Sequence, residues 1–225
     1  MSRIQTYNSF HIGSELGLSE LQMDQLGACF KRPLRTGGSA LGGRSEFLRI
    51  ELRGVGRVVI KNYSRGGIIR HFNKRTYLKI CRPRCESEYK FLHYLKKLNI
   101  SSPEPVAFAF TGGFFYHAWL VTREIEHAQT LAELSVKDLK RTEKALEKLE
   151  GQIELLINNS ILHIDLHPGN VLIDGSGKIY IIDFDKARIN EKYTTSQLEK
   201  IYISRWKRAV LKHHLPPILH ELMSN

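Results

Sequence analysis

Apolar and polar positions repeat with two different periods along this chain, and the period changes near its middle. In the first half, short runs that alternate apolar and polar residues are bounded by glycines, a pattern that predicts β-hairpins. One similar hairpin is expected in the second half, at Asp174-Gly175-Ser176-Gly177. The three expected hairpins pair residues 47–52 with 58–63, 107–110 with 118–125, and 171–173 with 179–182.

Apolar residues spaced three or four apart predict helices elsewhere. The expected helices comprise a short one through Leu18, Leu21, Leu26 and Phe30, and longer ones over 86–98, 136–158 and 195–223. Residues 1–17 are expected to be a polar segment that leads into the first helix. The glycine-rich stretch 36–43 is expected to be a loop. Strands followed by helices favour an α+β fold. We expect two lobes, over residues 1–126 and 127–225.

The net positive charge of the chain indicates which class of partner it favours. The chain has 225 residues, with 34 lysines and arginines against 23 acidic residues, for a net charge of +11. Such a field favours polyanions, whether nucleic acid, nucleotides or anionic lipid, without choosing among them. The most basic stretch runs from Lys61 to Arg84 and contains no acidic residue.

Cysteine usage and hydropathy exclude other classes. The three cysteines are too few for a disulfide framework and fit a reducing compartment. Cys81 and Cys85 are spaced like one of the two ligand pairs of a zinc site, but no second cysteine or histidine pair completes the site. No run approaches the ~20 apolar residues of a membrane span. The first residues also lack the apolar region of a secretory signal.

The segment from Leu162 to Ile189 carries the candidate chemistry. Asp165 is followed by Asn170, and Asp183 comes at the end of an expected strand. A hairpin between Asn170 and Asp183 would bring the three polar groups to one end of a small sheet. Carboxylate and amide oxygens suit Mg²⁺, which keeps waters and substrate phosphates as its other ligands. The alternative is that these residues are only loop caps and turn residues.

Two motifs here resemble the protein-kinase-like superfamily: His163-Ile-Asp165-Leu-His-Pro-Gly-Asn170 and Ile182-Asp183-Phe184-Asp185. The resemblance implies a two-lobed fold. A small antiparallel sheet and one main helix would form the N-lobe, with a reduced, mostly helical C-lobe. It also implies ATP and Mg²⁺. Asp165 would accept the acceptor's proton, His163 would brace the loop, and Asn170 and Asp183 would hold the metal.

The resemblance extends upstream. Lys61, in Val58-Val59-Ile60-Lys61, is similar to the strand lysine that contacts the α- and β-phosphates. Glu88 is similar to the helix glutamate that orients this lysine, and we prefer it to Glu86 by helix register. Two further groups of residues are implied to contact ATP. They are the phosphate-covering loop with Gly42, Gly43 and Ser45, which lacks the usual glycine spacing, and the adenine hinge at Glu124, Ile125 and Glu126.

One subfamily is more similar still, the bacterial 3-deoxy-D-manno-octulosonic acid (Kdo) kinases. The matching elements include residues 59–70, with Arg65-Gly66-Gly67, and Ile182-Asp-Phe-Asp-Lys-Ala-Arg188. The resemblance implies ATP-dependent phosphorylation of the 4-hydroxyl of Kdo in Kdo–lipid A. It also implies a peripheral position on the cytoplasmic face of an inner membrane. Its anionic surface would face basic residues drawn from Arg65, Arg70, Lys74, Arg75, Lys79, Arg82 and Arg84. No protein partner is implied.

Other functions remain possible from the residues alone. A phosphotransferase for a free sugar or amino alcohol would share Asp165, Asn170 and Asp183 but would not need the basic stretch. A nucleic-acid-binding module would use the positive field, yet it leaves those three residues unexplained, so we expect no nucleic-acid partner. A catalytically inactive kinase-like scaffold is disfavoured because the polar residues of the motif are all present.

Overall fold

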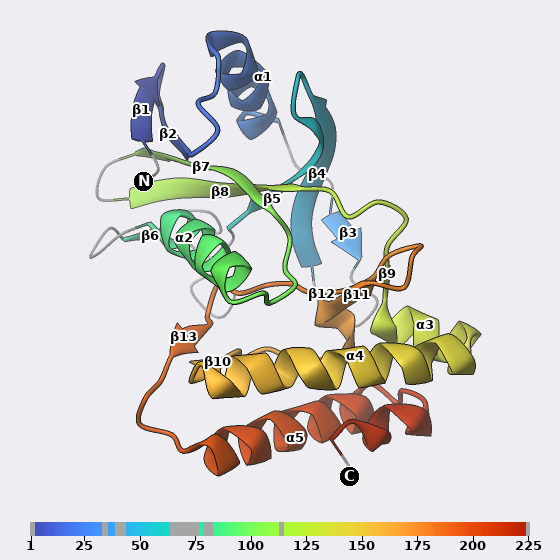
Figure 1. Cartoon of the computed structure of the whole chain (residues 1–225). Coiled ribbons are helices and arrows are strands. Elements are labelled where there is room, and N and C mark those ends of the chain that lie inside the picture. The colour runs from blue at the N-terminus through green and yellow to red at the C-terminus, as the bar shows by residue number, and fades with distance from the viewer. Residues whose placement is uncertain are drawn as a thin grey trace. The chain divides into compact units, whose positions relative to one another are not determined.

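The computed structural model describes residues 3–32, 36–38, 44–63, 77–78, 83–112 and 115–223. Contacts between residues divide the chain into two compact units. The first contains the described residues of 1–38, 44–93 and 104–124, and the second those of 94–103 and 125–225. The expected α+β fold is confirmed, with an antiparallel sheet in the first unit and mainly helices in the second (Figure 1).

An antiparallel sheet forms the centre of the first unit. Its strands follow the order β1-β2-β7-β8-β5-β4-β3, and β6 pairs with β8. Their bounds are β1 (Arg3–Tyr7), β2 (Phe10–Ser14), β3 (Thr36–Gly38), β4 (Arg44–Leu52), β5 (Gly56–Asn62), β6 (Tyr77–Leu78), β7 (Pro105–Gly112) and β8 (Phe115–Arg123). Two expected hairpins, β4–β5 and β7–β8, are confirmed.

Two expectations for the first unit are wrong. Residues 1–17 contain the hairpin β1–β2, which turns at Asn8 with a positive φ of 52° and joins the sheet through β7. Residues 36–38 form the edge strand β3, which pairs with the start of β4. In both cases a partner strand supplies the backbone hydrogen bonds that decide the conformation. The sequence pattern within a short segment does not show which strand this partner is.

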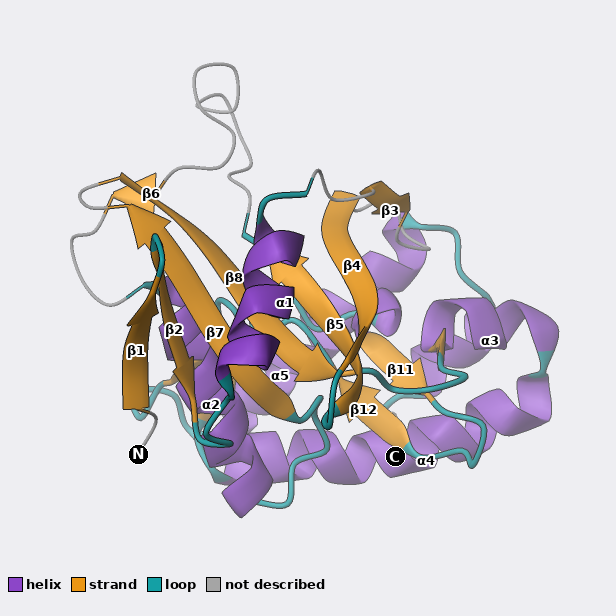
Figure 2. Cartoon of the chain, turned by 90° about the horizontal axis from the view of Figure 1, so that it is seen from above, coloured by secondary structure: helices purple, strands orange, loops and turns teal. Residues whose placement is uncertain are grey.

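Helices α1 (Glu20–Phe30) and α2 (Arg84–Lys97) lie on opposite faces of this sheet (Figure 2). A capping box between Ser19 and Gln22 starts α1. Side chains alternate along β8, so that Trp119 and Val121 join the α1 core while Ala118 and Leu120 point to the opposite face. The core on the α1 side is formed by Phe10, Ile12, Leu18, Met23, Leu26, Cys29, Phe30, Leu52, Val58, Ile60, Val106, Ala107, Ala109, Trp119 and Val121.

The second unit is built mainly from helices α3 (Leu131–Lys137), α4 (Leu139–Asn158) and α5 (Thr195–Lys212). Its short strands are β9 (Gln129–Thr130), β10 (Ile161–Leu162), β11 (Val171–Ile173), β12 (Ile179–Ile181) and β13 (Arg188–Ile189). The expected hairpin β11–β12 is confirmed, and β9 extends it to three strands.

The helix expected from about 136 to 158 is confirmed from Leu139 onward as α4, but residues 136 and 137 belong to α3, because the chain breaks at Asp138. This residue has φ −149° and ψ 96°, ends α3 and caps α4. Its carboxylate accepts a hydrogen bond from the backbone N–H of Arg141 at 3.0 Å. An aspartate in this extended conformation satisfies a helix terminus better than it would continue a helix.

Helices α4 and α5 lie side by side (Figure 1). The helix expected over 195–223 ends at Lys212, and a 3₁₀ turn, Pro217–Glu221, follows. The indole N–H of Trp206 donates to the carbonyl of Leu219 at 2.6 Å and holds this turn against α5. In the described part of the chain, no helix has the length and apolar character needed to cross a bilayer.

Candidate active site

Lys61 and Glu88 form an ion pair within the first unit. Lys61 follows Ile60 on β5, so its side chain points to the face that α2 covers. Its Nζ lies 3.3 Å from Oε2 and 3.4 Å from Oε1 of Glu88. The lysine side chain is 28% exposed and the glutamate only 3%. The buried carboxylate therefore fixes a lysine whose end still reaches solvent.

Tyr63 is a further partner of Glu88 that sequence reasoning missed. Its hydroxyl donates to Oε2 of Glu88, and Lys61 Nζ lies 5.2 Å from the centre of its ring. The spacing of two residues from Lys61 along an extended segment is a signal that could have indicated the shared face. Glu86 instead pairs with Lys90 one turn along α2, with 2.6 Å between Oε1 and Nζ.

The other expected nucleotide contacts lie at different places. Gly42 and Gly43 fall outside the described residues, as does the basic stretch 64–76 and 79–82. Ser45 lies in β4 opposite Gly37.

Cys85, one of the two cysteines considered for a zinc site, is buried. Its thiol donates to the carbonyl of Ala109, and burial strongly raises the pKa of this thiol.

Glu124, expected at the adenine hinge, is tied down by its neighbours. Its backbone N–H donates to the carbonyl of Arg57 at 3.0 Å. Its carboxylate lies 2.8 Å from Nε of Arg49 and 3.1 Å from Nε of Arg57. The boundary between the two units falls directly after it, before Ile125.

Asp165 lies in a loop of the second unit whose backbone is held at several points by side chains of α5. The backbone N–H of His163 donates to the hydroxyl of Tyr202 at 2.9 Å, and this hydroxyl donates to the carbonyl of Ile161 at 2.8 Å. The guanidinium of Arg205 donates to the carbonyl of Ile164. Two residues of α5 therefore position the loop, and sequence analysis assigned a role in the site to neither.

His163 is buried beneath this loop. Its Nε2 lies 3.0 Å from the carbonyl oxygen of Ile182, and its ring packs edge-on against Phe184 at 4.6 Å between centres. Burial lowers the pKa of His163 to about 4, so the ring is neutral near pH 7. Because a carbonyl only accepts hydrogen bonds, Nε2 carries the proton. The histidine links the Asp165 loop to the Asp183 loop.

Asn170 and Asp183 are brought together by backbone contacts between their two loops. The amide group of Asn170 donates from Nδ2 to the carbonyl of Asp165 at 2.8 Å. The backbone N–H of Ile182 donates to the carbonyl of Asn170 at 3.0 Å. Asp183 has a positive φ of 66°, an uncommon conformation that often occurs at functional sites.

The donor set of these two residues fits magnesium. With Nδ2 engaged, Asn170 retains its amide oxygen, and Asp183 adds a carboxylate, so both offer hard oxygen ligands. Magnesium takes few protein ligands and completes its shell with water and phosphate oxygens. Across the residues that the structure describes, no cluster of three histidine, cysteine or acidic side chains forms a metal cage.

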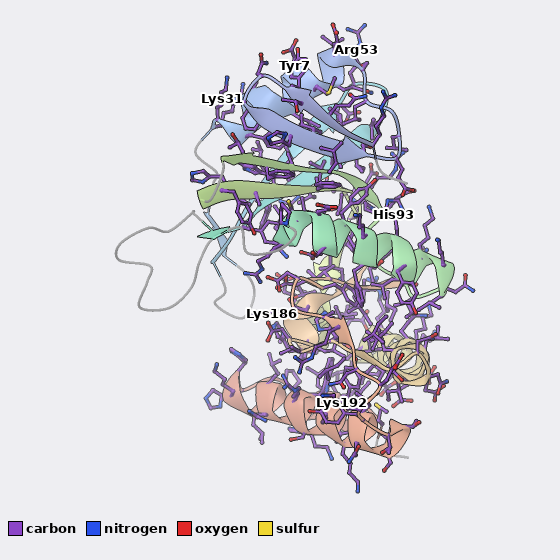
Figure 3. The ribbon with its side chains drawn as sticks, turned by 90° about the vertical axis from the view of Figure 1, so that its left-hand side faces the viewer. Tyr7, Lys31, Arg53, His93, Lys186 and Lys192 are labelled. Atoms are coloured by element: carbon purple, nitrogen blue, oxygen red, sulfur yellow. The ribbon has the colours of Figure 1, made fainter. Side chains whose placement is uncertain are left out.

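Lys186 is a charged contact that sequence reasoning missed. Its Nζ lies 2.7 Å from Oδ2 of Asp165, and the two side chains are 55% and 38% exposed. The lysine is labelled in Figure 3. The lysine comes three residues after Asp183, inside the motif already singled out. The expected site residues thus group as Lys61, Glu88 and Glu124 in the first unit, and His163, Asp165, Asn170 and Asp183 in the second.

Comparisons with known proteins agree on one family. A model of the lipopolysaccharide kinase (Kdo/WaaP) family matches residues 42–215. A 3-deoxy-D-manno-octulosonic acid kinase of Vibrio parahaemolyticus serotype O3:K6 is 30% identical over 184 residues, which cover 79% of this chain and 75% of the relative. A kinase of the same name from Vibrio cholerae serotype O1 is 24% identical over 206 residues, or 88% and 87% of the two chains. One from Xylella fastidiosa strain M12 is 26% identical over 174 residues, or 76% and 68%. The chain therefore belongs to the lipopolysaccharide kinase (Kdo/WaaP) family and is a phosphotransferase that acts on an alcohol group.

Proposed function

We propose that this protein transfers the γ-phosphate of ATP to the 4-hydroxyl of Kdo in Kdo–lipid A. The observation that carries the proposal is the hydrogen-bonded pair of loops that presents Asp165, Asn170 and Asp183 together. The choice of Kdo as the acceptor sugar comes from the relatives, because the three described above are named as Kdo kinases. The 4-hydroxyl, lipid A and ATP come from the family resemblance and are part of the proposal.

Asp165 is assigned the role of general base. Its side chain is 38% exposed and can therefore reach an acceptor hydroxyl from solvent. The hydroxyl oxygen forms a bond to the γ-phosphorus while its proton passes to the Asp165 carboxylate. The bond from that phosphorus to the β–γ bridging oxygen breaks, and ADP leaves with the electron pair. His163, buried and neutral, holds the backbone on either side of the site.

Asn170 and Asp183 are assigned to Mg²⁺, through the amide oxygen and the carboxylate. A bound magnesium ion neutralises charge on the nucleotide phosphates. Lys61, oriented by Glu88 and Tyr63, is assigned to the α- and β-phosphates. We retain as proposals the phosphate-loop contacts of Gly42, Gly43 and Ser45. The same holds for the adenine hinge at Glu124 and Ile125 and for lobes that span residues 1–126 and 127–225.

A peripheral position on the cytoplasmic face of the inner membrane is the last part of the proposal. Kdo–lipid A is anionic and lies at an anionic bilayer, which attracts basic side chains by ~1 kcal/mol each. One exposed face of α5 carries several such side chains, together with Leu211, which is 65% exposed. The basic members of this α5 face are Lys200, Lys207, Arg208 and Lys212. The sequence from Arg205 to Leu215 contains no acidic residue.

Mass spectrometry of Kdo–lipid A tests the proposal directly. The lipid is incubated with the protein, Mg²⁺ and ATP, and we expect a product heavier by one phosphate. Fragmentation then assigns the phosphate to the sugar and to its position. Asp165→Asn serves as the matched control, with an expected loss of activity of roughly 10²- to 10⁴-fold. No added phosphate on Kdo–lipid A, together with phosphorylation of a free sugar or amino alcohol, would refute the proposed substrate.

A further inference from the structure

The Lys186 ammonium group lies directly against the proposed base. Its Nζ is 2.7 Å from Oδ2 of Asp165, although 21 residues separate the two in the sequence. Both belong to the second unit, so the contact is internal to one compact body. Figure 3 labels Lys186 and Lys192, which both belong to the segment between β12 and α5.

Stability does not explain this ion pair. Its side chains are 55% and 38% exposed, and pairs this exposed contribute about 0–1 kcal/mol to folding. The local backbone nevertheless imposes the approach of the lysine. Ala187 N–H donates to the carbonyl of Phe184 at 3.0 Å, and Phe184 is 1% exposed against His163. The turn that carries Lys186 is thus anchored to the buried centre of the site.

No other positive group takes this place in the described part of the chain. Lys186 is the only described cation within 4.0 Å of the Asp165 carboxylate. His167 lies two residues after Asp165, but burial lowers its pKa, and its Nδ1 accepts from the N–H of Gly169 at 3.1 Å. His167 is therefore neutral near pH 7. The hydrogen bond with Asp165 raises the pKa of Lys186, which keeps its charge.

We propose that Lys186 is a catalytic residue that donates a hydrogen bond to the transferring phosphoryl group while it remains bound to Asp165. An ammonium group has three N–H donors, and Asp165 uses one of them. The acceptor hydroxyl must lie within hydrogen-bond reach of the same carboxylate and about 3–3.5 Å from phosphorus. An ammonium on that carboxylate therefore borders the reaction centre. This inference rests on the proposed role of Asp165.

The expected benefit falls on the chemical step. The acceptor oxygen bonds to phosphorus, the bond to the β–γ bridging oxygen breaks, and the hydroxyl proton moves to Asp165. Negative charge is spread over the three non-bridging oxygens during this exchange, and a fixed cation stabilises it there. Lys186 would also hold the carboxylate in one orientation. Its loss is thus expected to lower kcat and to leave KM nearly unchanged.

Steady-state kinetics of three variants test the assignment. Lys186→Met is expected to lower kcat for Kdo–lipid A by about 10²- to 10³-fold, with KM for ATP changed by less than about threefold. Lys186→Arg keeps the charge and is expected to recover activity to within about tenfold of the wild type. Lys192→Met, which removes an exposed lysine from the same segment, is expected to behave as the wild type. Thermal unfolding of each variant reports on its fold.

Several results would overturn the assignment. Lys186→Met could retain kcat within about threefold of the wild type, or lose activity only through KM for ATP. Lys186→Arg could be as inactive as Lys186→Met while both unfold at a lower temperature. Basal ATP hydrolysis separates this inference from the proposed acceptor, because water then receives the same phosphoryl group. If Kdo–lipid A is not phosphorylated, the substrate proposal fails, and the effect of Lys186→Met on hydrolysis still decides the role of Lys186.

Discussion

At the scale of single residues, the site depends on side chains that neighbours hold in place. Glu88 is 4% exposed and contacts both Lys61 and Tyr63, and His163 is 1% exposed between the loops of Asp165 and Asp183. Such buried polar residues are costly unless partners satisfy them. Their hydrogen bonds therefore set the orientation of the more exposed residues that are proposed to meet the substrate.

Replacing Asp183 by asparagine is expected to weaken the binding of Mg·ATP. The change removes the one charged oxygen ligand of the proposed magnesium pair, and we expect a loss of affinity on the order of tenfold or more. Isothermal titration calorimetry with ATP measures it, in the presence and absence of Mg²⁺. Glu191→Gln, which removes an exposed carboxylate later in the same connecting segment, is the control. Unchanged affinity in Asp183→Asn would contradict its metal role.

The buried His163 makes stability depend on pH. Its pKa is about 4 in the folded protein against 6.5 in the unfolded chain, so between these values the unfolded chain binds more protons. Above pH 6.5 the histidine is neutral in both states and does not reduce the free energy of unfolding. As the pH falls from 6.5 toward 4, the unfolded chain takes up a proton that the folded protein does not, and the free energy of unfolding decreases. From pH 7 to pH 5 the expected loss is about 2 kcal/mol.

Urea unfolding at several pH values checks this expectation for His163. The comparison with His163→Leu isolates the histidine, because the carboxylates titrate in both proteins. The variant is expected to be less stable at pH 7 but to lose less stability between pH 7 and pH 5. Equal pH dependence of the two proteins would show that His163 does not cause the acid sensitivity.

At the scale of elements, close packing across the sheet limits what the strands tolerate. Gly13 of β2 lies under the ring of Phe108 on β7, and a Cβ at Gly13 would come within 2.2 Å of that ring. Phe108 is fully buried and packs against Tyr89 of α2, with 5.1 Å between ring centres. The glycine thus lets the N-terminal hairpin lie close to the rest of the sheet.

Gly13→Ala is expected to lower the free energy of unfolding by about 1–3 kcal/mol, because the buried ring has to move. Gly27→Ala is the matched control. Gly27 lies inside α1, where an added Cβ would be 3.7 Å from Phe10, an ordinary contact, and alanine favours a helix by about 1 kcal/mol. Chemical denaturation measures both variants. A Gly13→Ala protein as stable as Gly27→Ala would contradict the close packing.

At the scale of the whole molecule, charge is the property that the proposed function uses. The net charge of +11 would favour approach to an anionic lipid surface and to an anionic substrate. Reversible attachment of this kind needs no membrane-spanning helix. The α5 face supplies described basic residues for it, whereas the stretch expected from the sequence, residues 65–84, is largely outside the described part.

Reversing two charges on α5, with Lys207→Glu and Arg208→Glu, is expected to release the protein from anionic vesicles. Four units of charge change on the proposed contact face, and the loss is expected to be roughly 2 kcal/mol or more. Co-sedimentation with phosphatidylglycerol vesicles at low salt measures it. Arg3→Glu with Arg53→Glu makes the same change in net charge on exposed residues of the first unit. Equal release by both pairs would show that only net charge matters.

Local sequence determined much of this protein. Three hairpins and the glycine turns between them follow from short-range alternation, which depends only on neighbouring residues. The motifs around Asp165, Asn170 and Asp183 indicated the superfamily, and further elements at residues 59–70 and 182–188 indicated the Kdo kinases, in agreement with the family that the comparisons show. Such motifs can be recognised without the fold, because the residues of each motif lie within one short segment of the chain.

Tertiary structure decided the contacts between residues far apart in the chain. The pairing of β2 with β7 and the approach of Lys186 to Asp165 are of this kind. Each depends on which surfaces the packed core turns toward one another, and no short window of sequence contains that information.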